Sequence, residues 1–275
     1  MLAIHVTLIQ TRLKALGHYN GKIDGIRGPL THAAARKVFA TMKGPLPAGW
    51  QSWSDKRIVI GFLQLWAREE GIEPGPIDGW WGPQTDYAAG EMIRLQQGAP
   101  VAHVTPATAQ NPHHWPKESG VAAFYGPNGT SWSHPPPKMV KVPSPWPFRI
   151  AWNLRQTRTF LWAHVRTADS VATVLERIHS HYGEAEIRRL RLDIFSGDYS
   201  PRRKRGSASQ WSMHAWGIAY DFDDTRNRLN WGANQASLAR PEYRDFWEIW
   251  EAEGWVSLGR ARNYDWMHVQ AARLG

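Results

Sequence analysis

The chain has 275 residues, of which 42% are hydrophobic and 21% charged, a composition typical of a globular protein that is long enough for more than one domain. It contains no cysteine, which excludes disulfides and cysteine-ligated metal sites, so any metal must be bound by His, Asp or Glu. The formal net charge of +9 favours an anionic partner, such as nucleic acid, an anionic membrane or an acidic wall polymer.

The start of the chain lacks the features of a secretory signal. Its first residues have no basic lead and no long apolar run. The most apolar stretch, residues 58–67, is too short to cross a bilayer, which requires about 20 residues. We therefore expect no signal peptide and no stable membrane insertion, and synthesis in the cytoplasm.

The first 97 residues contain an internal repeat with an offset of 54 positions. The recurring residues are Gln10, Gly17, Gly21, Ile23, Asp24, Gly25, Gly28, Pro29, Thr31 and Ala34, which return as Gln64, Gly71, Gly75, Ile77, Asp78, Gly79, Gly82, Pro83, Thr85 and Ala88. In each copy a helical pattern ends at a glycine, a turn rich in Gly and Asp follows, and Gly-Pro opens a second helix. Self-similarity at a fixed period indicates a duplicated unit. We predict two small all-α, three-helix-like modules over residues 1–45 and 46–97.

The turn of the second copy, Ile-Asp-Gly-Trp-Trp-Gly-Pro-Gln-Thr at residues 77–85, resembles the signature of small helical peptidoglycan-binding domains. The first copy, residues 23–31, is a weaker match, because Arg27 stands where that family usually has an aromatic residue. The competing interpretation is that the Asp and Gly residues only shape a turn. For the modules as wholes, the resemblance implies wall binding, with Asp78, Trp80, Trp81 and Asp24 as the candidate residues.

The rest of the chain predicts a linker and a second domain. Residues 98–112 are rich in Ala, Pro, Thr and Gln without periodicity, which is typical of a linker. In the domain that follows, residues 113–275, we expect the Pro-rich segment 134–147 to be extended. The remaining predicted elements are a helix over 168–182, a half-buried strand over 187–195, a loop over 196–206, a strand within 213–222, a helix over 241–253 and a last short strand at His268. These elements predict an α+β domain with a small, mainly antiparallel sheet.

Two short motifs in this domain supply metal-ligand chemistry. Ser-Met-His-Ala-Trp-Gly-Ile-Ala-Tyr-Asp occupies residues 212–221, and Asp-Trp-Met-His occupies residues 265–268. His214, Asp221 and His268 are a plausible ligand set for one zinc ion, and three protein ligands leave one position open, as in catalytic zinc sites. Asp265 can stand beside the metal without binding it, where a carboxylate can accept the proton of an attacking water.

The two motifs resemble those of the VanY-like zinc peptidases, a family of D-Ala-D-Ala carboxypeptidases and L-alanyl-D-glutamate endopeptidases. The family pattern is Ser-x-His, then Gly-x-Ala-x-Asp, then an acidic residue three places before a His, and the similarity extends from about residue 115 to the C-terminus. The resemblance implies that Zn²⁺ is bound by His214, Asp221 and His268, that Asp265 is the general base, and that Ser212 forms a hydrogen bond near the site. One departure is Gln270, where many relatives have Glu; we expect this position to support the site without binding the metal.

Two assignments in this domain stay open. The basic loop 202–206 resembles the family's loop that supplies an arginine for a substrate carboxylate or the oxyanion. Arg202 and Arg205 are both candidates, and a solvated surface is the alternative for either. If Asp265 is not the base, Asp223 or Asp224 takes its place.

Taken together, these features resemble a modular phage-type endolysin. The resemblance implies hydrolysis of peptidoglycan stem peptides, first of all the L-alanyl-D-glutamate bond, because an endopeptidase fragments the wall. It also implies release through a holin and action on the wall from the periplasm, and we expect a monomer. The alternatives are a D-Ala-D-Ala carboxypeptidase and a non-catalytic wall-binding protein. Only charge supports nucleic-acid binding through residues 188–205, so we expect no nucleic-acid partner.

Overall fold

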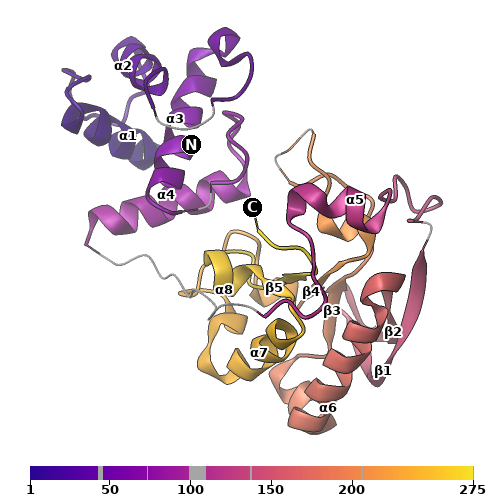
Figure 1. Ribbon diagram of the computed structural model, residues 1–275. Coiled ribbons are helices and arrows are strands. Elements are labelled where there is room, and N and C mark those ends of the chain that lie inside the picture. Colours follow the sequence, from indigo (N-terminus) through magenta and orange to yellow (C-terminus); the bar gives the residue numbers. More distant parts are fainter. Residues whose placement is uncertain are drawn as a thin grey trace. The chain divides into compact units, whose positions relative to one another are not determined.

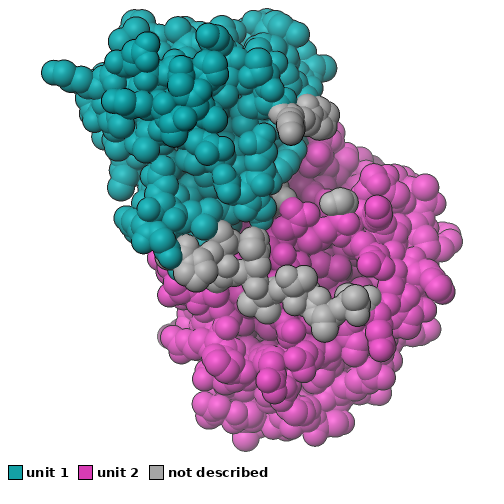
Figure 2. All heavy atoms as spheres, turned by 60° about the vertical axis from the view of Figure 1, so that its left-hand side comes forward, with its two compact units in different colours: residues 1–101, 205–207 teal, residues 102–204, 208–275 magenta. Residues whose placement is uncertain are grey.

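The structure is a computed structural model that describes residues 1–42, 46–72, 74–98, 110–136, 138–205, 207 and 209–274 (Figure 1). The chain forms two units, residues 1–101 with 205–207 and residues 102–204 with 208–275 (Figure 2). Helices make up the first unit and a six-stranded sheet with helices the second, so the predicted α+β class is confirmed. Most of the predicted linker, 98–112, lies outside the described residues. In the described part, no helix is both long enough and apolar enough to span a membrane.

The first unit contains the repeat. Its elements are α1 (Ala3–Ala15), α2 (Pro29–Phe39), a 3-10 turn (Trp50–Ser52), α3 (Asp55–Glu69) and α4 (Pro83–Gln96). Both copies are helical, as predicted, and α2 and α4 each open directly after a glycine with proline in the first turn. A third element appears among the described residues of the second copy only, as the 3-10 turn, and the described residues of the first copy hold two helices.

The second unit is built on one mixed sheet with the strand order β2-β1-β3-β4-β6-β5. The strands are β1 (Met139–Ile150), β2 (Asn153–His164), β3 (Ile194–Gly197), β4 (Ala219–Phe222), β5 (Val256–Ser257) and β6 (His268–Gln270). β1 and β3 are parallel and the other pairs antiparallel, which confirms a mainly antiparallel sheet. The Pro-rich segment is extended, as predicted, and the register of β1 shifts between Pro143 and Phe148, where prolines cannot donate ladder hydrogen bonds.

The helices of the second unit correct one prediction. They are α5 (Val121–Tyr125), α6 (Ala168–Leu190), α7 (Arg244–Ala252) and α8 (Leu258–Arg262), and α6 packs along β1 (Figure 1). The strand predicted over 187–195 is wrong in its first half, because α6 continues through a kink at Gly183 (φ 67°). Ile187 and Leu190 are three residues apart and both buried, so their spacing also fits one helix face. The strand starts only at Ile194.

Alternation along β4 fixes the direction of Asp221. Tyr220 and Phe222 flank it, and their rings lie 5.6 and 6.0 Å from the Trp250 ring in the core. Successive strand residues point to opposite faces, so these anchors turn the Asp221 side chain to the other face. Burial of each aromatic ring stabilises the fold by roughly 1.5–3 kcal/mol, and this stabilisation would be lost if the strand turned over.

Glu251 on α7 gives a prediction about stability. Burial raises its pKa to about 7, although Arg260 opposes this with its Nε 3.4 Å from Oε1. The folded chain therefore holds this proton more tightly than the unfolded chain. The free energy of unfolding keeps its full value below the pKa that Glu251 has in the unfolded chain. It falls as the pH rises above that pKa, until Glu251 is also ionised in the folded chain. The loss is about 3 kcal/mol above pH 7.

Glu251→Gln should therefore raise the free energy of unfolding at pH 8 and change it little at pH 4. Urea unfolding followed by tryptophan fluorescence at the two pH values measures this difference. Glu242→Gln is the control, because Glu242 is exposed and should change neither value. An equal effect of Glu251→Gln at both pH values would contradict the assignment.

Candidate metal centre

Three elements bring the predicted ligands together. His214 lies in a 3-10 turn (Met213–Trp216) that Gly217 ends with a φ of 66°, a conformation that favours glycine. Asp221 lies on β4 and His268 begins β6, and these two residues are register partners across the antiparallel pair. All three side chains are buried. The structure thus assembles the set that the two motifs predicted.

The ligand atoms have the spacing of a single small ion. His214 Nε2 lies 3.2 Å from His268 Nδ1 and 3.2 Å from Asp221 Oδ2. His268 Nδ1 lies 2.8 Å from Asp221 Oδ1. Zinc bonds of about 2.0–2.1 Å at a tetrahedral angle separate two ligand atoms by about 3.3 Å. The cluster therefore fits zinc in both donor type and spacing.

A backbone carbonyl orients His214. Its Nδ1 lies 2.6 Å from the carbonyl oxygen of Asp198, which only accepts, so Nδ1 carries the proton. Asp198 is itself held, because its Oδ2 accepts from the Trp162 N–H at 2.8 Å and forms an ion pair with Arg158. Nε2 of His214 is then the lone-pair nitrogen that faces the cluster, as metal ligation requires.

A series of side-chain hydrogen bonds, from Glu118 through Gln270, orients His268. Gln270 Nε2 donates to Glu118 Oε1 at 2.9 Å and to the Ala272 carbonyl at 3.0 Å, which turns its Oε1 toward the imidazole. That Oε1 lies 3.2 Å from His268 Nε2 and accepts its proton. Nδ1 therefore faces the cluster with its lone pair. Gln270 thus contacts a candidate ligand directly, and its support of a metal site stays a prediction.

The charges of the cluster favour a cation. Burial alone would raise the pKa of the Asp221 carboxyl, but in the metal-free chain the positive charge of a protonated His214 and hydrogen bonds from protonated imidazole nitrogens hold it well below its usual range. Burial lowers the pKa of the His268 imidazole, and its contacts with Asp221 only partly oppose this. A metal ion at the same point would take the place of these protons, with an ionised carboxylate and two imidazole lone pairs as its ligands in a buried space. Such a group is costly unless a positive charge compensates it.

Gln270→Leu is therefore expected to weaken zinc binding about 10–100-fold, the usual cost of losing a hydrogen bond to a ligating histidine. Competition with a chromophoric chelator measures the affinity. Glu118→Gln is the matched variant, because an amide oxygen can still accept from Gln270, and it should lose much less. If Gln270→Leu binds zinc as tightly as the parent chain, the orienting role is wrong.

Asp265 lies in the turn that leads into β6. It has a φ of 55°, its N–H donates to the Leu229 carbonyl at 3.1 Å, and its carbonyl accepts from the His268 N–H at 3.0 Å. The residue is buried. Its backbone is thus tied directly to a metal-ligand candidate, and its role as the base stays a prediction.

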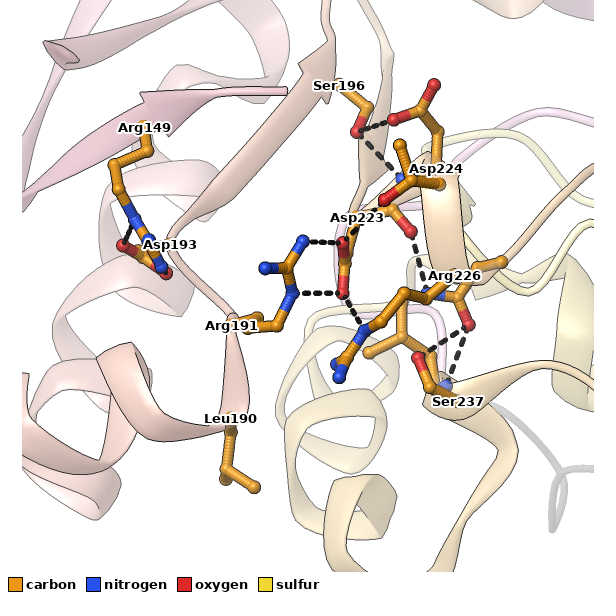
Figure 3. A network of polar contacts seen from close by, with 12 residues as sticks. Arg149, Leu190, Arg191, Asp193, Ser196, Asp223, Asp224, Arg226 and Ser237 are labelled. Carbon is orange, nitrogen blue, oxygen red and sulfur yellow. Dashed lines mark hydrogen bonds and ion pairs between the residues drawn. The ribbon is translucent and has the colours of Figure 1, made fainter. Parts of the chain in front are cut away.

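The two alternative bases, Asp223 and Asp224, form hydrogen bonds with other side chains of the fold (Figure 3). Asp223 is fully buried, and Arg191 donates to both of its oxygens, at 2.6 and 3.0 Å, while Arg226 donates at 2.6 Å. Asp224 Oδ1 accepts from the Ser196 hydroxyl at 3.1 Å. Asp223 therefore joins the end of β4 to the end of α6, and both carboxylates have hydrogen-bond partners within the fold.

A backbone hydrogen bond and a difference in exposure distinguish the two candidate arginines, Arg202 and Arg205. Ser212 is buried at the start of the His214 turn, and its N–H donates to the Arg202 carbonyl at 3.0 Å. Arg202 is partly buried, whereas Arg205 is exposed. Arg202 is thus tied to the segment that carries a ligand, and substrate contact by either arginine stays a prediction.

In the repeat, Asp24 and Asp78 form the same internal network. Gln10 Nε2 donates to Asp24 Oδ1 at 2.9 Å, and Gln64 Nε2 donates to Asp78 Oδ1 at 3.2 Å. Each glutamine Oε1 accepts the N–H of the next glycine, Gly25 or Gly79, at 2.9 Å. Both aspartates therefore organise their turns, which is the competing interpretation of the motif. Wall binding through their carboxylates stays a prediction.

The two tryptophans of the second turn differ in exposure. Trp80 is 60% exposed, and the Arg57 guanidinium lies 5.2 Å from its ring centre. Trp81 is partly buried, stacks on His5 with ring centres 4.7 Å apart and donates to Asp86 Oδ1 at 3.1 Å. Trp80 therefore presents the larger free ring surface of the two candidates.

Sequence reasoning missed Glu118 and Asp198, and it noted the repeated glutamines without assigning them a role. Asp198 acts on His214 through a backbone carbonyl, which no residue type reveals. The recurrence of Gln10 as Gln64 was a usable signal, because a buried amide at the same place in both copies indicates a shared network.

Comparisons with protein-family models, curated proteins and solved structures gave no match.

Proposed function

We propose that the second unit is a zinc peptidase that hydrolyses the stem peptides of peptidoglycan, with the bond between L-alanine and D-glutamate as its substrate. The observation that carries this proposal is the buried cluster of His214, Asp221 and His268, in which hydrogen bonds turn both lone-pair nitrogens toward one point beside an ionised carboxylate. Three such ligands match the composition of a catalytic zinc site, which keeps one position open.

The chemistry divides between the metal and the chain. Zn²⁺ held by the three ligands would act as a Lewis acid and make water nucleophilic near neutral pH. Asp265 would accept a proton from the attacking water and deliver it to the leaving amine. The Asp198 carbonyl and Gln270 keep both imidazoles in the tautomer that ligation needs. Arg202 or Arg205 would neutralise a substrate carboxylate or the oxyanion.

The wall substrate is supported by the two helical modules and by the positive charge. Their turn resembles a peptidoglycan-binding signature, and Trp80 is exposed at its tip. A tether of this kind raises the effective concentration of substrate near the catalytic unit. A basic chain suits the anionic cell envelope.

Digestion of purified peptidoglycan, followed by mass spectrometry of the new termini, tests the proposal. New N-terminal D-glutamate that disappears with a chelator and returns with zinc is the expected result. Release of D-alanine alone would identify a carboxypeptidase instead. Binding to the wall with no new termini in the presence of zinc would identify a non-catalytic wall-binding protein.

A further inference from the structure

A groove lined by aromatic side chains lies directly beside the metal centre. It has a volume of 520 Å³, and its aromatic residues are Trp132, Trp152, Trp162 and Tyr199. All of them belong to the second unit. We refer to this space as the aromatic groove.

The aromatic groove shares its wall with the metal ligands. Gly197 and Asp198 line it. A Cβ added at Gly197 would lie 3.8 Å from Asp221 Oδ2 and 4.0 Å from His214 Cε1, and the Asp198 carbonyl accepts the proton of His214. The groove and the cluster are therefore neighbours that meet at Gly197 and Asp198.

Two tryptophans present open ring surface to this groove. Trp132 is 71% exposed and Trp152 is 70% exposed. The other exposed large apolar residues among those described in the second unit are Leu154 and Val165. Exposed apolar surface that gathers at one place marks a binding site more often than scattered residues do.

Both rings are supported from behind. Trp132 meets Tyr199 edge to face with ring centres 5.5 Å apart, and the Tyr199 hydroxyl donates to the Ser131 carbonyl at 2.7 Å. Trp152 meets Phe195 edge to face at 6.2 Å. These contacts restrict the rings before a ligand arrives, which lowers the entropic cost of binding.

The polar groups of the groove complement the rings. Arg158 and the Asp198 carboxylate form an ion pair in its wall, and Ser200 also lines the groove. Flat apolar surface next to hydrogen-bonding groups suits a pyranose ring, which has C–H faces and a rim of hydroxyl and amide groups. An aliphatic peptide side chain would contact the rings but make no use of the charged pair beside them.

We propose that the aromatic groove binds the sugar to which the stem peptide is attached, an N-acetylmuramoyl ring, and so selects the bond that reaches the metal. This inference rests on the proposed function. The L-alanyl-D-glutamate bond lies one residue from the sugar, whereas the terminal D-Ala-D-Ala bond lies three residues, or roughly 10 Å, farther along an extended peptide. A sugar held beside the ligands therefore favours the nearer bond.

Binding tests the sugar site without requiring turnover. N-acetylmuramoyl-L-alanine and N-acetyl-L-alanine are titrated calorimetrically into the zinc-loaded full chain. The muramoyl compound is expected to bind more tightly, and Trp132→Ala and Trp152→Ala should each weaken it about tenfold, the scale of one lost ring contact. Leu154→Ala is the control, since this exposed residue does not line the groove. Equal binding of the two compounds, or unchanged binding in both tryptophan variants, would overturn the proposal.

Cleavage then separates the two proposals. The parent chain should cut a muramoyl stem peptide with a higher kcat/KM than the sugar-free peptide, and the tryptophan variants should lose only this difference. If neither peptide is cut while sugar binding depends on the tryptophans, the peptidase proposal fails and the sugar site stands. If both peptides are cut equally well, the peptidase stands and the sugar site fails.

Discussion

His214→Ala is expected to remove bound zinc and abolish peptide hydrolysis. The substitution deletes one of three ligands and leaves Asp221 and His268 facing a gap with two donors. The loss of affinity should exceed the roughly 10–100-fold that follows loss of a single supporting hydrogen bond. Metal content after dialysis, measured by elemental analysis, should fall from one zinc per chain to a trace.

His181→Ala is the matched control, because this half-exposed histidine on α6 pairs with Asp245 at 3.2 Å and lies outside the cluster. It should keep both zinc and activity. Retention of full activity by zinc-free His214→Ala would show that the hydrolysis does not depend on this cluster.

Asp265→Asn should separate zinc binding from turnover. Asparagine keeps the size of the side chain but cannot act as a base, so zinc content should persist while kcat falls by about 10²–10⁴. The measurement pairs elemental analysis with cleavage of a stem peptide. Asp224→Asn is the control, because the Asn side-chain oxygen can still accept from Ser196, and its kcat should match the parent chain.

Each other outcome for Asp265 has a distinct meaning. Loss of zinc from Asp265→Asn would make Asp265 a ligand, and the set would then close around the metal as structural sites do. An unchanged kcat would exclude it as the base. Neither outcome would alter the assignment of His214, Asp221 and His268.

The ligand set was predictable because each ligand stands in a short motif and the motifs lie on adjacent strands. Antiparallel pairing of β4 with β6 then places Asp221 opposite His268. The residues that orient them were not predictable in the same way. Glu118 contacts Gln270 across 152 positions of the sequence, a distance over which local spacing carries no information.

The fold shows the same division between local and long-range effects. The helix over residues 168–182 follows from its periodicity, but the end of α6 does not. Leu190, Leu192 and Ile194 alternate as in a strand, but Ile187 and Leu190 are both buried and share one helix face, and the helix forms. The aromatic groove also escaped prediction, because Trp132 and Trp152 are distant from Tyr199 in sequence and their exposure is a property of the folded chain.

In the repeat, the residues that hold each turn together are different from the residue that projects into solvent. Gln10 and Gln64 form equivalent hydrogen bonds inside the turns of the two copies. The side chains that project at the equivalent position are Ile26, 66% exposed, and Trp80, 60% exposed. The projecting residue contributes its carbonyl oxygen to the network, and every amino acid has one. One copy can therefore change what it displays while the other keeps its surface, which lets a gene duplication diversify recognition at little cost in stability.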